Sequence, residues 1–186
     1  MRLAAAVLCL SMALPGLVQA LTPARPVVLV GASVVQFWTD EHPAFFTDHP
    51  DYLDKGRAGE PPSSTVERLA REVLPLNPRV LVFVTGGAAT AERTRHDLAR
   101  FVDLGRRHGA KVVLAASPSV SQENLAAIHD YAAREGLGYA DFADMRGTEG
   151  RVKPGLTYDG VHPTLAGYVL MEPAMVAAVD RVLANP

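Results

Sequence analysis

The stretch VLVGASVVQFW, residues 28–38, indicates the fold class of this chain. A run of β-branched and aliphatic residues ends at Gly31, and an amphipathic pattern follows it directly. Such a continuous apolar run is typical of a strand that is buried on both faces of a sheet. Ser33 lies where the strand gives way to a helix, so its hydroxyl is either a helix cap or a nucleophile.

The same alternation of apolar runs and helical patterns continues along the chain. Strands are predicted at residues 27–30, in a short piece that ends around 51–54, and at 79–85, 111–116 and 138–142. Helices are predicted at residues 34–46, with an interruption near 42–43, and at 63–72, 90–108, 121–135 and 164–183. The second of these helices has the pattern of a capping box, because Glu67 follows Ser64 at the spacing that this motif requires.

Strands separated by helices of this length predict a parallel sheet that helices cover on both faces. Ligands of such sheets bind in the loops at the carboxyl ends of the strands. The loops of interest are therefore at residues 31–33, 56–62, 85–89 and 117–120. Residues 56–64, GRAGEPPSS, are loop-like but too short to separate two domains, so residues 21–186 are predicted to form a single domain.

The composition excludes some classes of partner. The chain has 186 residues, of which 48% are hydrophobic, and a formal net charge of −2. A chain of this length can bury a sizeable core. The most basic stretch, residues 106–108, has the pattern of the last turn of a helix that ends at Gly109. Nucleic acid and anionic membrane surfaces are therefore not expected as main partners.

The first twenty residues form a separate segment. Arg2 precedes an apolar run from Leu3 to Leu14, and small residues follow up to Ala20. This layout is typical of a signal peptide that is cleaved near Ala20, although a short membrane anchor is the alternative. The only cysteine, Cys9, lies inside the segment. We therefore expect a cysteine-free mature chain, without a transmembrane segment, that is periplasmic or secreted.

Two glycine-containing loops do not carry a nucleotide-binding motif. GASVVQ, residues 31–36, lacks the second and third glycines of the dinucleotide-binding fingerprint, and VTGGAAT, residues 84–90, is equally incomplete. Neither loop predicts a nucleotide cofactor.

The stretch TYDGVHPTLAGY, residues 157–168, carries a carboxylate and an imidazole just ahead of a helix. Asp159 can orient one nitrogen of His162 and leave the other as a general base. Asp159 is alternatively a helix cap or a turn residue, and His162 is alternatively an exposed residue at a helix start or a metal ligand. A metal site needs at least three ligands, and the other histidines form no ligand-like pair, so no metal is predicted.

Taken together, these motifs resemble the SGNH (GDSL-like) hydrolase superfamily from residue 27 to about residue 182. DGVHPTLAGY is similar to the terminal block of that family, and GASVVQFW and DKGRAGEPPSS resemble its first and second blocks. The resemblance implies a flavodoxin-like three-layer α/β/α sandwich. It also implies that Ser33 is the nucleophile, His162 its base and Asp159 the residue that orients His162. The backbone N–H groups of Ser33 and Gly59 would then form the oxyanion hole.

One position departs from the family pattern. The third block normally ends in an asparagine whose amide completes the oxyanion hole, and Ala88 stands there in this chain. Losing one such donor typically lowers turnover by about 10²–10³. The enzyme is therefore slow, or a neighbour substitutes, or the fold has become a binding module. The candidate neighbours are Thr85, Thr90 and the backbone of residues 87–88, with Asn124 as a more distant one.

The resemblance implies an exported serine esterase that hydrolyses a small acyl ester, with an O-acetyl group on a carbohydrate as one candidate, and needs no cofactor. The alternative is a catalytically weakened protein that binds a glycan or an acyl ligand in the cell envelope. Specificity is expected in the loops at residues 38–62 and 144–158. Four aromatic residues, Phe37, Trp38, Phe45 and Phe46, either line a substrate pocket or belong to the core, and their helical spacing favours the core.

Overall fold

Five parallel strands form the middle layer of the fold. The computed structural model describes residues 25–87 and 89–185. The strands are β1 (Val27–Gly31), β2 (Tyr52–Gly56), β3 (Val80–Thr85), β4 (Lys111–Ala116) and β5 (Gly138–Ala140). Their order in the sheet is β2-β1-β3-β4-β5, and every pair is parallel. This is the strand order of flavodoxin-like folds.

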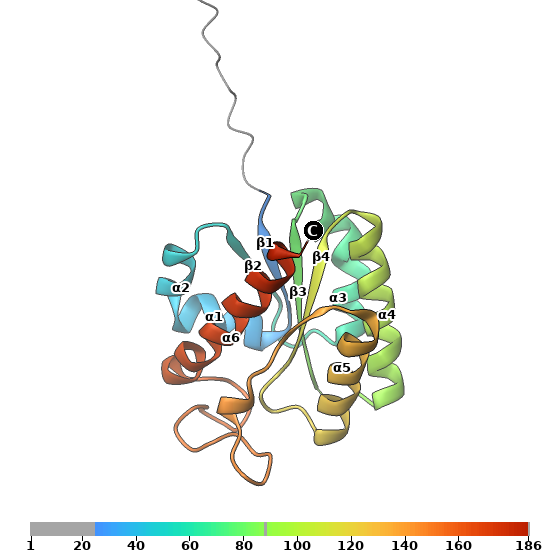
Figure 1. The fold of residues 1–186 in the computed structure, drawn as a ribbon. Helices are drawn as coiled ribbons and strands as arrows, with labels where there is room; N and C mark the ends of the chain where they lie inside the picture. Colours follow the sequence, from blue (N-terminus) through green and yellow to red (C-terminus); the bar gives the residue numbers. More distant parts are fainter. Residues whose placement is uncertain (1–24, 88, 186) are drawn as a thin grey trace, which may run out of the picture.

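Helices cover both faces of this sheet. They are α1 (Ser33–Glu41), α2 (Pro43–Asp48), α3 (Pro62–Arg68), α4 (Ala91–Arg107), α5 (Gln122–Glu135) and α6 (Leu165–Ala184). Figure 1 shows α1, α2 and α6 on one side of the sheet and α3, α4 and α5 on the other. The predicted three-layer α/β/α sandwich is therefore confirmed.

The alternation of side chains along β1 explains why both faces of the sheet have to be covered by helices. Val27 and Leu29 belong to the apolar cluster under α1 and α6, whereas Val28 and Val30 belong to the cluster under α3, α4 and α5. All four side chains are fully buried. A strand that is apolar on both faces is stable only inside such a sandwich, because burying apolar surface is the main favourable term in folding.

The register of the sheet brings the functional loops together. Gly31, the last residue of β1, is paired with Gly56 at the end of β2 and with Val84 near the end of β3. The loops that follow these three strands therefore leave the sheet at one edge, the lower edge in Figure 1. The connection from β5 to α6, which carries Asp159 and His162, lies at this edge as well (Figure 1).

The ends of most helices agree with the sequence signals. Thr90, Ser121 and Thr164 each accept a backbone N–H in the first turn of α4, α5 and α6. The predicted capping box at Ser64 is wrong, since α3 begins with Pro62 after an N-cap at Pro61, and no side chain caps it. Proline is pre-organised for the first helical position, so it moves the start of the helix upstream of the serines.

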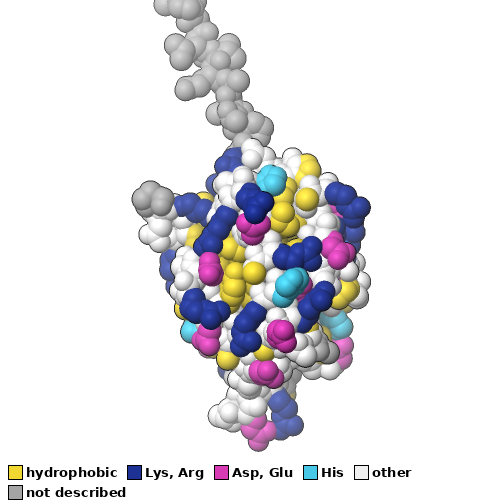
Figure 2. Space-filling view, turned by 90° about the vertical axis from the view of Figure 1, so that its right-hand side faces the viewer, with side chains coloured by type: hydrophobic (Ala, Val, Ile, Leu, Met, Phe, Trp, Pro, Cys, Tyr) yellow, Lys and Arg dark blue, Asp and Glu magenta, His cyan; other side chains and the backbone are white. Residues whose placement is uncertain are grey.

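Charges of both signs are mixed over the helical face turned to the viewer in Figure 2. Ion pairs account for part of this mixing, for example Arg106 Nη1 with Glu135 Oε2 at 2.8 Å and Arg107 Nε with Asp103 Oδ1 at 2.9 Å. Among the described residues, no helix combines the length and the hydrophobicity needed to cross a bilayer. The predicted signal peptide and Cys9 lie outside the described residues, so cleavage near Ala20 stays a prediction.

Candidate active site

Ser33 is the first residue of α1, directly beyond the end of β1. The preceding residue, Ala32, is the N-cap, and no side chain caps the helix. The Ser33 hydroxyl is therefore not used as a cap. Its backbone N–H belongs to the first turn, where N–H groups have no partner inside the helix and the helix dipole favours negative charge.

A hydrogen-bonded chain joins three of the predicted site residues. His162 Nε2 lies 2.9 Å from Ser33 Oγ, and His162 Nδ1 lies 2.7 Å from Asp159 Oδ2. The serine comes from the start of α1, and the other two residues come from the loop that precedes α6. Serine, imidazole and carboxylate are thus arranged as nucleophile, base and orienting group.

Asp159 is held by the backbone of its own loop. Its Oδ1 accepts the N–H groups of His162 at 2.8 Å and of Val161 at 2.9 Å, which leaves Oδ2 for the imidazole. The backbone N–H of His162, its imidazole and the Val161 N–H together lower the pKa of Asp159 to about 2. The carboxyl group is therefore ionised over the whole range in which an imidazole titrates.

Two contacts of α1 set the position of Ser33 relative to His162. The Tyr168 hydroxyl, in the first turns of α6, donates a buried hydrogen bond of 2.9 Å to the Val34 carbonyl of α1. The Phe37 ring of α1 lies 5.3 Å from the His162 ring, measured between centroids. Both contacts fix the loop with His162 against the helix that begins with Ser33.

The loop after β2 brings Gly59 to the first turns of α1. Gln36 Oε1 accepts the Ala58 N–H at 2.7 Å, directly before Gly59. Gly56 approaches the same helix so closely that a Cβ there would lie 2.2 Å from the Gln36 nitrogen, so only glycine fits. Gly59 has a φ of +77°, a conformation that glycine adopts without strain.

Buried polar contacts hold the two ends of this loop. Asp54 Oδ1 accepts the Gly56 N–H at 2.6 Å, and burial raises the pKa of the Asp54 carboxyl group. Glu60 forms a buried ion pair with Arg68, at 2.8 Å between Oε2 and Nε, and also accepts the Thr65 hydroxyl. No motif in the sequence indicates the positioning roles of Gln36 and Glu60. Gln36 acts on a loop beyond the next strand, and Glu60 acts on the helix that follows its own loop.

The loop after β3 contains the departure from the family pattern. Ala88 lies outside the described residues, whereas its neighbours Gly87 and Ala89 are described. The Ala89 carbonyl accepts the side-chain amide of Asn124 at 2.6 Å. The Asn124 oxygen in turn accepts the hydroxyl of Thr94. The Asn124 amide therefore donates to the backbone of the loop after β3.

The hydroxyl groups of Thr90 and Thr85 are the other two suggested side-chain substitutes for the missing oxyanion-hole donor. The Thr90 hydroxyl accepts the Arg93 N–H as the cap of α4, at 3.3 Å. Thr85 is the last residue of β3, and its side chain is buried. No contact of either hydroxyl joins it to Ser33 or His162 among the described residues.

The four aromatic residues after Ser33 divide into two groups. Trp38 and Phe45 are fully buried. Their rings pack against each other, and Trp38 also packs against Tyr168 and Phe45 against Tyr52. Phe37 and Phe46 are partly buried at the edge of the same cluster. The core interpretation is therefore confirmed for Trp38 and Phe45, whereas Phe37 also faces His162. Within residues 25–87 and 89–185, no three His, Cys, Asp or Glu side chains are grouped as a metal site would require.

Comparisons with known proteins give structural matches. No protein-family model and no curated protein matches the sequence. A Bacteroides fragilis protein assigned to the acylhydrolases has a TM-score of 0.76 and 25% identity, over 87% of this chain and 89% of that one. A GDSL-like lipase from Bacteroides thetaiotaomicron has a TM-score of 0.75 and 24% identity, over 85% and 89% of the two chains. An acetyl xylan esterase has a TM-score of 0.66 and 18% identity, over 83% and 99%.

The match to the Bacteroides fragilis protein supports a hydrolase kind of function, and the other two matches show that the fold is shared. Together with the strand order and the arrangement of the three blocks around one edge of the sheet, they identify this chain as a member of the SGNH (GDSL-like) hydrolase superfamily.

Proposed function

We propose that the protein is a serine ester hydrolase that acts through an acyl-enzyme, with Ser33 as nucleophile, His162 as base and Asp159 as the group that orients His162. The observation that carries this proposal is the continuous chain of contacts from Ser33 Oγ to His162 Nε2, at 2.9 Å, and from His162 Nδ1 to Asp159 Oδ2, at 2.7 Å. An unassisted serine hydroxyl is a weak nucleophile at neutral pH, and an adjacent base activates it.

The first half of the reaction acylates the serine. Ser33 Oγ forms a bond to the acyl carbon of the ester while its proton moves to His162 Nε2. The negative charge on the former carbonyl oxygen is stabilised by the backbone N–H groups of Ser33 and Gly59. The bond from the acyl carbon to the alcohol oxygen then breaks as His162 Nε2 returns the proton to that oxygen.

The second half of the reaction releases the acid. A water molecule attacks the acyl carbon, and His162 Nε2 takes the proton of the water. The bond to Ser33 Oγ breaks, and the hydroxyl regains its proton from the imidazole. Throughout, the Asp159 carboxylate holds Nδ1–H and stabilises the imidazolium that forms in each half.

The substrate that we propose is a small acyl ester, with an O-acetyl group on a carbohydrate as the leading candidate. One supporting observation is the acetyl xylan esterase among the proteins of the same fold. Another is that the His162 side chain is 31% exposed, so a bulky alcohol group has access to it from solvent. We further propose that the chain is exported, because residues 1–20 have the layout of a signal peptide.

A second candidate function is binding without turnover, as a glycan-binding or acyl-binding protein of the cell envelope. The observation that favours it is Ala88, which offers no side-chain donor at the position of the family asparagine. The two candidates differ in a simple assay, because only the enzyme releases p-nitrophenol from p-nitrophenyl acetate.

The proposed reaction is tested with purified wild type, Ser33→Ala and Ser119→Ala. We expect wild type and Ser119→Ala to hydrolyse p-nitrophenyl acetate at the same rate, and Ser33→Ala to show only the background rate. Circular dichroism checks that the variants are folded. Equal rates for wild type and Ser33→Ala would contradict the assignment of the nucleophile.

A further inference from the structure

A second site lies at the edge of the sheet next to β5. α5, the end of β5, Ala143 and the loop at residues 146–150 line an open pocket of about 720 Å³. Small-molecule sites typically have volumes of about 300–1,000 Å³. None of its lining residues belongs to the hydrogen-bonded chain of Ser33, Asp159 and His162.

A small hairpin forms the wall opposite α5. Arg146 pairs with Val152 in an antiparallel bridge, and the Gly147 N–H donates to the Arg151 carbonyl at 2.8 Å. The tip of this hairpin touches the first turn of α5, since a Cβ on Gly150 would lie 2.2 Å from Gln122 Nε2. The hairpin is therefore held at a fixed place over the pocket.

The guanidinium of Arg146 in this wall lacks the partners that a buried cation needs. Its side chain is only 7% exposed, and Nε and Nη2 are buried without an acceptor among the described residues. Nη1 lies 3.7 Å from Asp141 Oδ1, which is longer than a hydrogen bond. A buried guanidinium with two nitrogens lacking acceptors and one long ion pair destabilises a fold, so a residue of this kind is better explained by a ligand than by stability.

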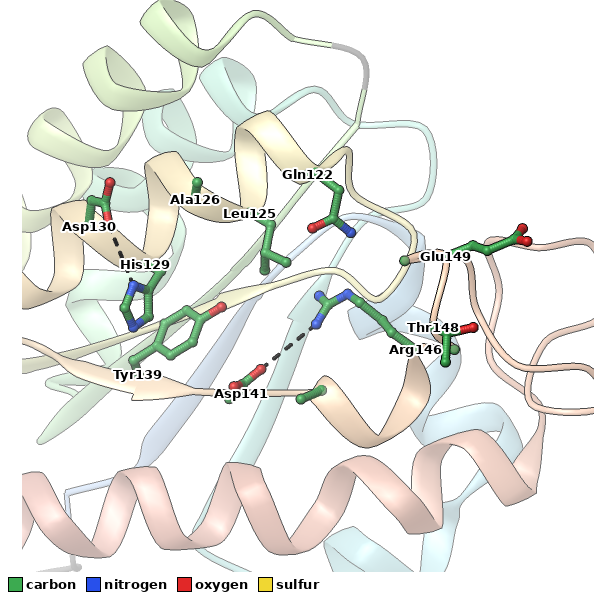
Figure 3. Close-up of a pocket in the computed structure, with 13 residues that line it drawn as sticks. Gln122, Leu125, Ala126, His129, Asp130, Tyr139, Asp141, Arg146, Thr148 and Glu149 are labelled. Carbon is green, nitrogen blue, oxygen red and sulfur yellow. Dashed lines mark ion pairs between the residues drawn. The ribbon is translucent and has the colours of Figure 1, made fainter.

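Polar and aromatic groups converge on the same pocket. Figure 3 shows Tyr139 and Arg146 entering from opposite sides, with Asp141 between them and Gln122 above. The Tyr139 ring rests against His129, at 5.3 Å between centroids and nearly perpendicular. Burial and the neighbouring Asp141 raise the pKa of Tyr139 to about 12, so its hydroxyl remains protonated and can both donate and accept.

The charges in the pocket select between classes of ligand. Asp130, Asp141 and Glu149 line the pocket together with Arg146. Arg151 pairs with Glu149 from outside the pocket, so two carboxylates remain against one arginine, and an anionic ligand would meet net repulsion. An acyl chain would leave the arginine and the carboxylates without partners. A neutral ligand with adjacent hydroxyl groups fits both, because each hydroxyl donates to a carboxylate and accepts from the guanidinium.

We propose that this pocket binds a neutral saccharide, with Arg146 donating to one sugar hydroxyl, Asp141 accepting from its neighbour, and Tyr139 lying against the sugar ring. The hairpin belongs to the connection between β5 and α6 that also carries Asp159 and His162. The binding itself does not require that Ser33 reacts.

The test is a calorimetric titration of the wild-type protein with four tetrasaccharides. Three are neutral (xylotetraose, cellotetraose and mannotetraose), and the acidic one is tetragalacturonate. We expect at least one neutral tetrasaccharide to bind more tightly than tetragalacturonate. Arg146→Met and Asp141→Ala should each weaken that binding about tenfold or more, since a hydrogen bond to a charged group is lost. Lys153→Met, an exposed position just beyond the same hairpin and outside the pocket, is the matched control and should leave binding unchanged.

Thermal unfolding separates a binding role from a structural one. Replacing a buried arginine whose hydrogen bonds are incomplete with methionine should leave the Tm unchanged or higher. The proposal is wrong if no neutral tetrasaccharide binds, if tetragalacturonate binds most tightly, or if Arg146→Met lowers the Tm and leaves binding intact. Hydrolysis of p-nitrophenyl acetate is a separate readout, so failure of this site and failure of the proposed esterase reaction are distinguishable.

Discussion

The Tyr168 hydroxyl donates a hydrogen bond of 2.9 Å to the carbonyl of Val34, and this buried contact joins α6 to α1. Val34 follows Ser33 directly, and Tyr168 lies in the helix that begins just after His162. One hydrogen bond thus connects the two segments that supply the nucleophile and the base. Because it lies within the core, it holds their separation without occupying the site itself.

Tyr168→Phe removes this hydroxyl and keeps the ring that packs against Trp38. We expect the free energy of unfolding to fall by about 1 kcal/mol, the usual net contribution of one hydrogen bond. The kcat for p-nitrophenyl acetate should fall as well, because Ser33 and His162 are less precisely placed. Urea denaturation and steady-state kinetics measure the two effects, and no change in either would mean that the bond has no positioning role.

Asp159→Asn should lower kcat strongly without unfolding the protein. The Asp159 side chain is 52% exposed, so the fold loses little, whereas the imidazole loses the carboxylate that fixes its tautomer. A loss of about 10²–10⁴ in kcat is expected by analogy with other serine hydrolases. Asp144→Asn, an exposed aspartate on the same connection, is the control. A loss of less than tenfold would assign Asp159 a mainly structural role.

The pH profile should show the titration of a single group on the acid side. The pKa of Asp159 is lowered to about 2, so its carboxyl group is already ionised at higher pH. Only the proton on the His162 imidazole has to leave before the imidazole can act as a base, so activity falls as the pH is lowered. We expect log kcat/KM to change with a slope of one, and not two, on the acid side of the profile, because one general base controls the rate. A slope of two would show that a second group, such as Asp159, also titrates there.

Gln36 tests whether the Gly59 loop matters for catalysis. Gln36→Met keeps the length of the side chain but removes the acceptor of the Ala58 N–H, so the loop is less firmly held against α1. A misplaced donor can cost up to about a hundredfold in rate, and we expect kcat to fall roughly tenfold or more. Gln36→Glu retains an acceptor and should restore most of the rate. Equal rates for Gln36→Met and wild type would remove this residue from the site.

Ala88→Asn tests the departure from the family pattern. If the missing amide limits the rate, the substitution should raise kcat by about tenfold, which is below the full value of 10²–10³ because a new side chain is not held in place. Thr85→Val and Thr90→Val test the alternative that a neighbouring hydroxyl already acts as the donor. A rate that does not increase in Ala88→Asn, together with a loss in one of these variants, would support that alternative.

The elements that could be predicted from sequence are those fixed by local signals. β4 spans the predicted residues 111–116, and α5 begins after Ser121 and ends at Gly136, because an apolar run or a capping residue marks each end. The start of α3 was mispredicted because two prolines outweighed the capping pattern at Ser64. Local sequence signals therefore predict most helix and strand ends. They do not show which of two competing signals, such as a proline and a capping serine, sets the start of a helix.

The candidate site was predictable where its residues lie in short motifs, and not where it depends on contacts across the fold. Ser33, Asp159 and His162 became candidates from their places at the end of a strand and ahead of a helix, and the resemblance to the SGNH hydrolases implied their roles. Gln36 and Arg146 carried no such signal, because an exposed glutamine and a loop arginine gain their roles only through their neighbours in space. Export remains a prediction from residues 1–20.

Covalent labelling tests the central claim most directly. Wild type, Ser33→Ala and His162→Ala are incubated with a fluorophosphonate, and the modified peptide is located by mass spectrometry. A serine hydrolase forms a stable adduct on its activated serine, so we predict one adduct, on Ser33, that is absent from Ser33→Ala and forms far more slowly in His162→Ala. No adduct on wild type, or an adduct on another serine, would contradict the assignment of Ser33 as the nucleophile.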